Sequence, residues 1–441
     1  MTGAWDERPL AEIRRKGDGM EENRLKEIVV QGEVNPDGDE RNAPNGGPNY
    51  KKGKRLKLMS MAMYAGLLPT SSLALINDKE MYLKRKAYFM EKEGTLIKER
   101  IAGELAYRIK KMPQDVALIE LSDACPKTYD FYLRNSETML ARMKGRTWKG
   151  DEKRMYRNAE AILFCDRLPV AYSLDGKGSL REKFKGAEYY TPQELLADSG
   201  GNFDDGKYEV ELNREFTFPI GGSRNNGVLF TKGGIYVIYN FSKWYMEFKG
   251  TSETYLLDYV SNIAAAREVS ADVSVLFLYH SNKILSELAN PSVKNMKSVR
   301  KVTEVYGSVY ALPLTEEGQI LASCMCVPGW RDFMGSLFRV EKPKAGDEVN
   351  TDYLYRTDGI TRDADGTVRY VILFAVPDVK KLSRLMDTID NATDRSRFVV
   401  RCFDFQESFI KEFMPEGVTI QTASFEKFME KAREHLRIEG E

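Results

Sequence analysis

Apolar residues between positions 54 and 76 recur at helical spacing in two short segments. "KRLKLMSMAMYAG" (54–66) has apolar residues on most of its turns and predicts a helix that ends near Gly66. Pro69 and the Thr-Ser-Ser that follows it have the composition of a turn and a helix cap. They predict a second, shorter helix at "SLALI" (72–76).

A third helix and a two-stranded ribbon are predicted next. In "KEMYLKRKAYFMEKEG" (79–94), Leu83, Ala87 and Met90 form one apolar stripe, and Gly94 stands in a usual C-cap position. Either Asn77 or Asp78 is the expected N-cap. "TLIKERI" and "ELAYRIK" flank a tight turn at Ala102-Gly103 and predict a β-hairpin. Three short helices followed by a hairpin predict a winged helix-turn-helix over residues 51–112.

The remaining pattern indicates a helical connector (113–220) and a mixed-sheet α/β domain (221–441). "GVLFTKGGIYVIYN" predicts two strands joined at Lys232-Gly233-Gly234, and "KWYMEFKG" is a candidate third strand. "ADVSVLFLYHS" is apolar throughout, which is typical of a buried strand. A later hairpin is expected to turn at Ala364-Asp365-Gly366, and strands and helices then alternate to the C-terminus. The predicted fold class is therefore mixed, α+β or α/β.

Composition changes this picture mainly at the N-terminus. Residues 1–50 are rich in Gly, Pro, Asn and Asp and have little to bury, which predicts a disordered leader. No apolar run approaches the roughly 20 residues that a membrane helix needs, and no signal core is present, so we expect a cytoplasmic protein without membrane contact. Five scattered cysteines, without a CxxC pair, and two histidines predict reduced thiols and neither a metal site nor a cofactor.

The charge is unevenly distributed, although Lys+Arg and Asp+Glu both total 66. Residues 51–112 have 15 basic and 6 acidic side chains. Such a cluster predicts contact with the phosphates of double-stranded DNA, and a solvated helical face is the simpler alternative. The candidate DNA-binding residues belong to the third helix, the hairpin and the first helix: Lys84, Arg85 and Lys86, then Lys98, Arg100 and Arg108, then Lys54 and Arg55.

One motif offers a catalytic alternative. Glu247 and Lys249 in "YMEFKG" are two residues apart, so a strand would place both side chains on one face. Restriction-type nucleases use a Glu-x-Lys pair together with an upstream acid to hold a divalent metal. No Asp or Glu lies between Gly221 and Met246, and a surface ion pair is the simpler interpretation.

Two other motifs fail the tests for known sites, and two further features have simpler structural roles. "GGSRNNG" is followed by a predicted strand and lacks the Gly-Lys-Ser/Thr ending of a phosphate-binding loop. "DGKGSL" contains only Gly176-x-Gly178 of a dinucleotide fingerprint. Cys324 and Cys326 would share one face of a strand, where two small buried side chains are the simpler reading. Asp404 ends a predicted strand, and its simplest role is a helix N-cap.

The layout resembles the replication-relaxation family of plasmids and integrative conjugative elements. The matching stretches are "KRLKLMSMAMYAGLLPTSSLALINDKEMYLKRKAYFMEKEGTLIKE" and "SRNNGVLFTKGGIYVIYN", the latter followed by a helix from near Ser252. The resemblance implies a winged helix joined to an α/β domain shaped like restriction-type nucleases. Tyr239 and Asn240 end the strand where an acid would support a nuclease site, so the resemblance favours binding over catalysis.

These observations lead to one main expectation about function. We expect a non-enzymatic DNA-binding protein of a mobile element, acting in its replication, transfer or transcriptional control. Its partners would be double-stranded DNA and either a second copy of the chain or replication and transfer proteins. The alternatives are a metal-dependent nuclease at Glu247 and Lys249 and a protein-interaction scaffold.

Overall fold

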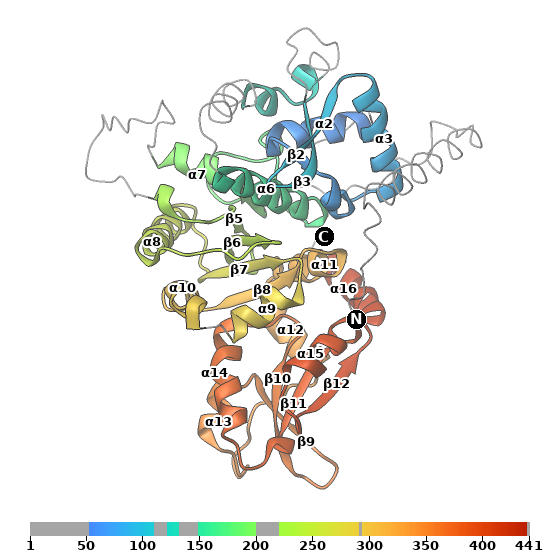
Figure 1. Cartoon of the computed structure of the whole chain (residues 1–441). Helices are drawn as coiled ribbons and strands as arrows, with labels where there is room; N and C mark the ends of the chain where they lie inside the picture. The colour runs from blue at the N-terminus through green and yellow to red at the C-terminus, as the bar shows by residue number, and fades with distance from the viewer. Residues whose placement is uncertain (1–52, 110–120, 132–148, 200–219, 291–292, 439–441) are drawn as a thin grey trace, which may run out of the picture. The chain divides into compact units, whose positions relative to one another are not determined.

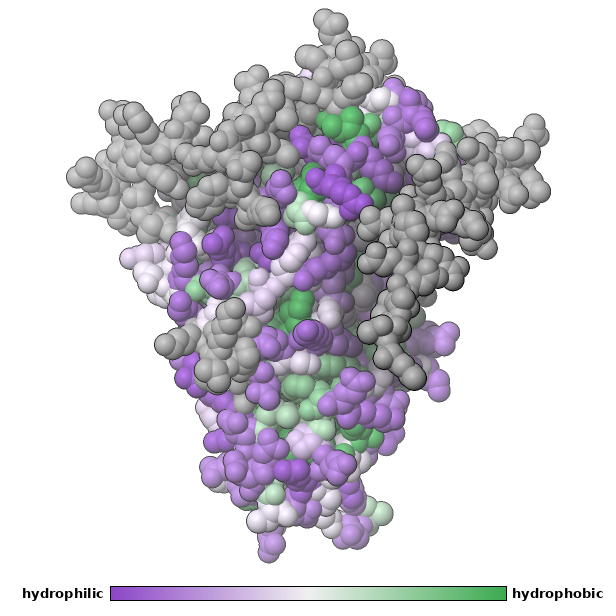
Figure 2. Space-filling model, viewed as in Figure 1, coloured by the Kyte–Doolittle hydropathy of each residue, from purple (hydrophilic) through white to green (hydrophobic). Residues whose placement is uncertain are grey.

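The computed structural model describes residues 53–109, 121–131, 149–199, 220–290 and 293–438, and it has a mixed α+β architecture with three sheets (Figure 1). The predicted leader, 1–50, lies outside the described residues. Hydrophilic residues cover most of the described surface on the side drawn in Figure 2, and hydrophobic ones show between them in smaller patches. Within the described ranges, no helix combines the length and the apolar character needed to cross a bilayer.

The first described part is a small module of residues 53–109, with its elements in the predicted order. They are α2 (Gly53–Ala65), β1 (Leu68–Pro69), the 3₁₀ helix η1 (Thr70–Leu75), α3 (Glu80–Lys92), β2 (Leu96–Ile101) and β3 (Glu104–Ile109). All three predicted helices are present, and the second is a 3₁₀ helix. Leu83, Ala87 and Met90 are fully buried, as the apolar stripe of α3 predicts. The N-cap prediction is wrong: Lys79 occupies that position, and the Asp78 carboxylate accepts from its backbone N–H.

The predicted hairpin of the module is confirmed. β2 and β3 pair antiparallel, and both turn residues have positive φ, 54° at Ala102 and 86° at Gly103. Positive φ at both central residues matches the right-handed twist of the two strands. β1 adds to the other edge of β3, so the sheet order is β1-β3-β2.

A five-stranded sheet forms the second part, and its strands follow the chain order. They are β4 (Glu188–Tyr190), β5 (Val228–Phe230), β6 (Ile235–Ser242), β7 (Val273–Tyr279) and β8 (Val309–Pro313). The pairs among β4, β5 and β6 are antiparallel, whereas β6, β7 and β8 run parallel. Every residue of β6 is buried, because helices pack on this sheet. These helices are α6 (Lys149–Phe164), α8 (Gly250–Ala266), α9 (Asn282–Ala289) and α11 (Glu316–Met325), and α10 (Val293–Thr303) packs against α8 (Figure 1).

A four-stranded sheet near the C-terminus has the order β12-β11-β10-β9. Its strands are β9 (Gly359–Arg362), β10 (Val368–Leu373), β11 (Phe398–Phe403) and β12 (Thr419–Ala423). β9 and β10 form the predicted hairpin, and β10, β11 and β12 are parallel. The other elements of this part are α12 (Trp330–Leu337), α13 (Thr351–Arg356), α14 (Val379–Asp390), α15 (Glu407–Phe413) and α16 (Phe425–Ile438).

The prediction of a strand at "KWYMEFKG" (243–250) is wrong. Residues 243–249 are an irregular connection between β6 and α8, and side chains satisfy some of its backbone groups. Arg157 donates to the carbonyl of Trp244 at 3.0 Å, and the N–H of Phe248 donates to Ser298 Oγ at 2.8 Å. Without a neighbouring strand to pair with, alternation in the sequence does not produce a strand.

The reading of Cys324 and Cys326 as small buried side chains is confirmed, but they lie at the end of α11 and not on a strand. All five cysteines are buried and free of disulfides, as expected for reduced thiols. Burial raises the pKa of the Cys324 thiol to about 12. The prediction of an N-cap at Asp404 is wrong, because Phe403 is the N-cap of the 3₁₀ helix η5 (Asp404–Gln406). The Asp404 carboxylate accepts from the backbone N–H groups of Phe405 at 2.9 Å and of Phe425 at 3.3 Å.

Candidate nucleic-acid interface

The buried stripe of α3 determines which of its cations face outward. Successive helical residues point about 100° apart, so Lys84, Arg85 and Lys86 cannot share one direction. Arg85 lies opposite the stripe of Leu83 and Ala87, and its two neighbours lie on the flanks. The three cations therefore point in different directions around the helix and do not form a single basic face.

The three cations of α3 also differ in their partners. Lys84 forms an ion pair with Glu80 at 2.8 Å, one turn earlier on the same helix. The Arg85 guanidinium lies 5.8 Å from the ring centroid of Phe89. Within the described ranges, neither Arg85 nor Lys86 forms an ion pair with an acidic side chain. These two side chains remain available to phosphate oxygens.

The ribbon contributes two cations with similar freedom. Lys98 lies 5.8 Å from the ring of Tyr107, and Arg100 is exposed and donates to the Gly103 carbonyl at 3.1 Å. Arg108 instead pairs with Glu99 at 2.6 Å, and its side chain is mostly buried. A cation that neutralises a protein carboxylate gains less from a phosphate.

The two predicted residues of α2 are committed to the module itself. Lys54 pairs with Asp78 at 2.9 Å and lies over the ring of Tyr82. Arg55 pairs with Glu93 and donates to Thr95 Oγ1 at 3.2 Å, which ties the start of α2 to the end of α3.

A buried polar network joins η1 to the five-stranded sheet. Glu160 of α6 is fully buried, and its Oε1 accepts from Ser72 Oγ at 2.9 Å and lies 2.7 Å from His280 Nε2. Its Oε2 accepts from Asn240 Nδ2 at 3.0 Å. Asn240 and His280 come from the carboxyl ends of the parallel strands β6 and β7. The network fixes the module's second helix against this end of the sheet.

A second buried contact completes the attachment. Gln319 of α11 is fully buried, and its Nε2 donates to the carbonyls of Leu75 at 2.8 Å and Phe164 at 2.9 Å. Leu75 and Phe164 end η1 and α6, where the last carbonyls of a helix lack partners within it. One amide group therefore satisfies the ends of two elements.

The network was missed from the sequence, although one signal was present. Glu160 interrupts the apolar run "AEAILF" of α6, and Asn240 interrupts the apolar run of β6 before Phe241. A polar residue at a buried position needs a hydrogen-bond partner, so each of the two residues indicates a buried polar partner elsewhere in the chain. The acid near the end of β6 is supplied by α6, a helix that the sequence pattern could not orient.

Lys177 is a further buried cation that the sequence did not single out. It lies in the Gly176–Gly178 turn, and its Nζ contacts both carboxylate oxygens of Glu194, at 2.8 and 2.9 Å. It also donates to Tyr64 Oη at 2.9 Å and to the Tyr189 carbonyl at 2.6 Å. Burial lowers the pKa of Lys177, and the charge of Glu194 opposes that shift. The turn thus joins α2, β4 and α7 (Pro192–Asp198).

The nuclease alternative rests on two exposed residues. Glu247 and Lys249 are both exposed, whereas Met246 and Phe248 between and beside them are buried. Within the described ranges, no group of three His, Cys, Asp or Glu side chains is arranged to hold a metal ion. The Glu-x-Lys alternative stays a prediction.

Glu253 of α8 is a buried acid near the same connection. Its carboxylate accepts from Ser223 Oγ at 2.7 Å and from the hydroxyl of Tyr239. Burial raises the pKa of Glu253, and these hydrogen bonds oppose the shift only in part.

Replacing Glu253 with glutamine should leave the protein at least as stable at pH 8. The folded state holds the Glu253 proton to a higher pH than the unfolded state, whose pKa is about 4.3. Stability is therefore lost as the pH rises from about 4.3 through the raised pKa, and a neutral amide avoids this loss. Urea unfolding of Glu253→Gln between pH 4 and 8 measures the effect, with the exposed Glu247→Gln as control. A Glu253→Gln protein less stable than the control by more than about 1 kcal/mol at pH 8 would contradict the argument.

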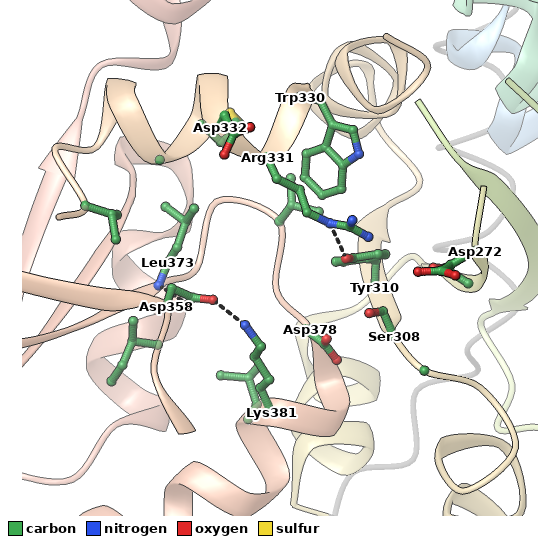
Figure 3. Close-up of a pocket in the computed structure, with 18 of the residues that line it drawn as sticks. Asp272, Ser308, Tyr310, Trp330, Arg331, Asp332, Asp358, Leu373, Asp378 and Lys381 are labelled. Carbon is green, nitrogen blue, oxygen red and sulfur yellow. Dashed lines mark hydrogen bonds and ion pairs between the residues drawn. The ribbon is translucent and has the colours of Figure 1, made fainter. Parts of the chain in front are cut away.

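A cavity of about 1070 Å³ has no residue of the small module in its lining (Figure 3). Its wall comes from the beginnings of β7 and β8, from α12, and from β10 and α14. Arg331 donates through Nε to Tyr310 Oη at 2.9 Å, and Lys381 pairs with Asp358 at 2.8 Å. Burial raises the pKa of Asp378, which accepts from the Lys380 N–H at 3.0 Å. Charges of both signs line the wall, so its chemistry does not select one class of ligand.

Comparisons with known proteins add no further identification. The chain matches no protein-family model, and searches of curated proteins and of solved structures found no match.

Proposed function

We propose that this chain is a double-stranded DNA-binding protein whose residues 53–109 form a winged helix. The observation that supports this most is the element order α2, β1, η1, α3, β2, β3 with sheet order β1-β3-β2. In this arrangement α3 would enter the major groove and the β2–β3 ribbon would contact the adjacent backbone. Arg85, Lys86, Lys98 and Arg100 are the cations that we assign to DNA.

The attachment of the module to the sheet supports the same proposal. The buried contacts of Glu160 and Gln319 fix η1, which precedes α3 in the chain. Because α3 packs against η1, the helix assigned to DNA loses little conformational freedom on binding, which favours affinity. Action in the replication, transfer or control of a mobile element rests on the resemblance to the replication-relaxation family alone.

The test is the binding of purified protein to random-sequence duplex DNA at several salt concentrations, measured by fluorescence anisotropy. The variant Arg85→Ala/Lys86→Ala/Lys98→Ala/Arg100→Ala should bind more weakly. The slope of log affinity against log salt should fall by roughly 0.9 for each lost phosphate contact. Weaker binding of this variant at every salt concentration follows from the same loss of charge.

The matched control removes the same charge elsewhere: Lys185→Ala/Lys283→Ala/Lys342→Ala/Lys344→Ala, all at exposed positions. An equal loss in both variants would mean that only net charge matters, and no binding by the wild type would overturn the proposal. The same samples contain magnesium, so they also test the nuclease alternative. Nicking of the DNA by the wild type that disappears in Lys249→Ala would support that alternative.

A further inference from the structure

The outward side of α3 carries more than cations. Met81 is 55% exposed, and Tyr88 and Phe89 are partly exposed. With Arg85 and Lys92, these residues recur at helical spacing on the side opposite the buried stripe. A helix that only neutralises phosphates has no need of exposed rings, so this combination calls for a ligand with an apolar surface as well as negative charge.

Cations lie against the rings of this helix. Arg85 is 5.8 Å from the centroid of Phe89, and Lys92 is 5.4 Å from that of Tyr88. The two rings are themselves 5.8 Å apart, edge to face. A cation within about 6 Å of a ring centroid is attracted to the face of the ring, and the same cation also attracts phosphate. Each ring therefore has a positive charge close to it that can also pair with a phosphate.

Unpaired nucleotides have both features that this side of α3 calls for, an apolar surface and negative charge. In a duplex the faces of the bases are covered by their neighbours, and a protein reaches only their edges. An unpaired base presents its face, which stacks on aromatic side chains beside cations that track the backbone. We propose that Tyr88 and Phe89 stack on unpaired bases, so that the protein prefers DNA in which a duplex adjoins an opened segment. The inference rests on the proposed DNA-binding function and names the form of DNA at the same site.

The experiment compares three labelled DNAs of equal length by fluorescence anisotropy: a full duplex, a duplex with a short central bubble and a single strand. The wild type should bind the bubble roughly 10-fold or more tightly than the duplex, given typical contributions of base stacking. In Tyr88→Leu/Phe89→Leu, which keeps apolar bulk but removes the rings, the ratio of the two affinities should fall to near one.

The control replaces two exposed rings elsewhere, Tyr255→Leu/Tyr355→Leu, and should keep the wild-type ratio. Circular dichroism and thermal unfolding establish that each variant is folded before its ratio is used. Equal wild-type affinity for bubble and duplex, or a preference that survives in Tyr88→Leu/Phe89→Leu, would overturn the inference while leaving duplex binding intact. A wild type that binds none of the three DNAs would refute the proposed function as well.

Discussion

Replacing Lys177 with methionine should lower the free energy of unfolding by about 3–5 kcal/mol, as expected when one partner of a buried ion pair is removed. The side chain of Lys177 is 1% exposed, and its loss would leave the Glu194 carboxylate without its cation and Tyr64 without a donor. Urea unfolding of the full chain, followed by circular dichroism, measures the change.

Two further variants separate the ion pair from simple loss of packing. Lys177→Met/Glu194→Gln removes both charges but keeps an acceptor for the Thr191 cap, and it should recover most of the stability. Arg181→Ala removes an exposed ion pair with Asp198 and should cost no more than about 1 kcal/mol. If the double variant is as unstable as Lys177→Met, the uncompensated charge is not the cause.

Glu160→Ala should lower the free energy of unfolding by about 3 kcal/mol or more. The substitution removes the shared acceptor of Ser72, Asn240 and His280, and a buried polar group left unpaired, as Ser72 would be, costs about 1–3 kcal/mol. Because the network holds η1 against the sheet, amide hydrogen exchange should also quicken in η1 more than in β11.

The exposed Glu430→Ala on α16 is the control and should change stability by no more than about 0.5 kcal/mol. Uniformly faster exchange in η1 and β11 after Glu160→Ala would mean that the network stabilises the whole chain equally. It would then have no special role in attaching the small module.

The sequence predicted the elements whose signals are local. The stripe of Leu83, Ala87 and Met90 defined α3, and Ala102-Gly103 marked the turn of the hairpin because positive φ is needed there. Each of these signals depends on a few neighbouring residues. These signals do not depend on distant segments of the chain.

The failures came where distant residues decide the outcome. The alternation in "KWYMEFKG" is typical of a strand, but Arg157 and Ser298 bind its backbone groups and no strand pairs with it. The candidate site shows the same division. The sequence located the cations of α3 and the hairpin, but only the fold shows that Lys84 and Arg108 are paired with acids while, among the described residues, Arg85 and Arg100 form no such pair.

The amide of Gln319 has a consequence for the order in which the chain is made. It lies 244 residues beyond Leu75, whose carbonyl it satisfies. While the ribosome has synthesised only the first third of the protein, the end of η1 has no such partner. The module then depends on water or on other contacts at that point. A recombinant fragment that stops soon after residue 109 would share this deficit, so the stability of the isolated module would understate the stability that η1 has in the whole chain.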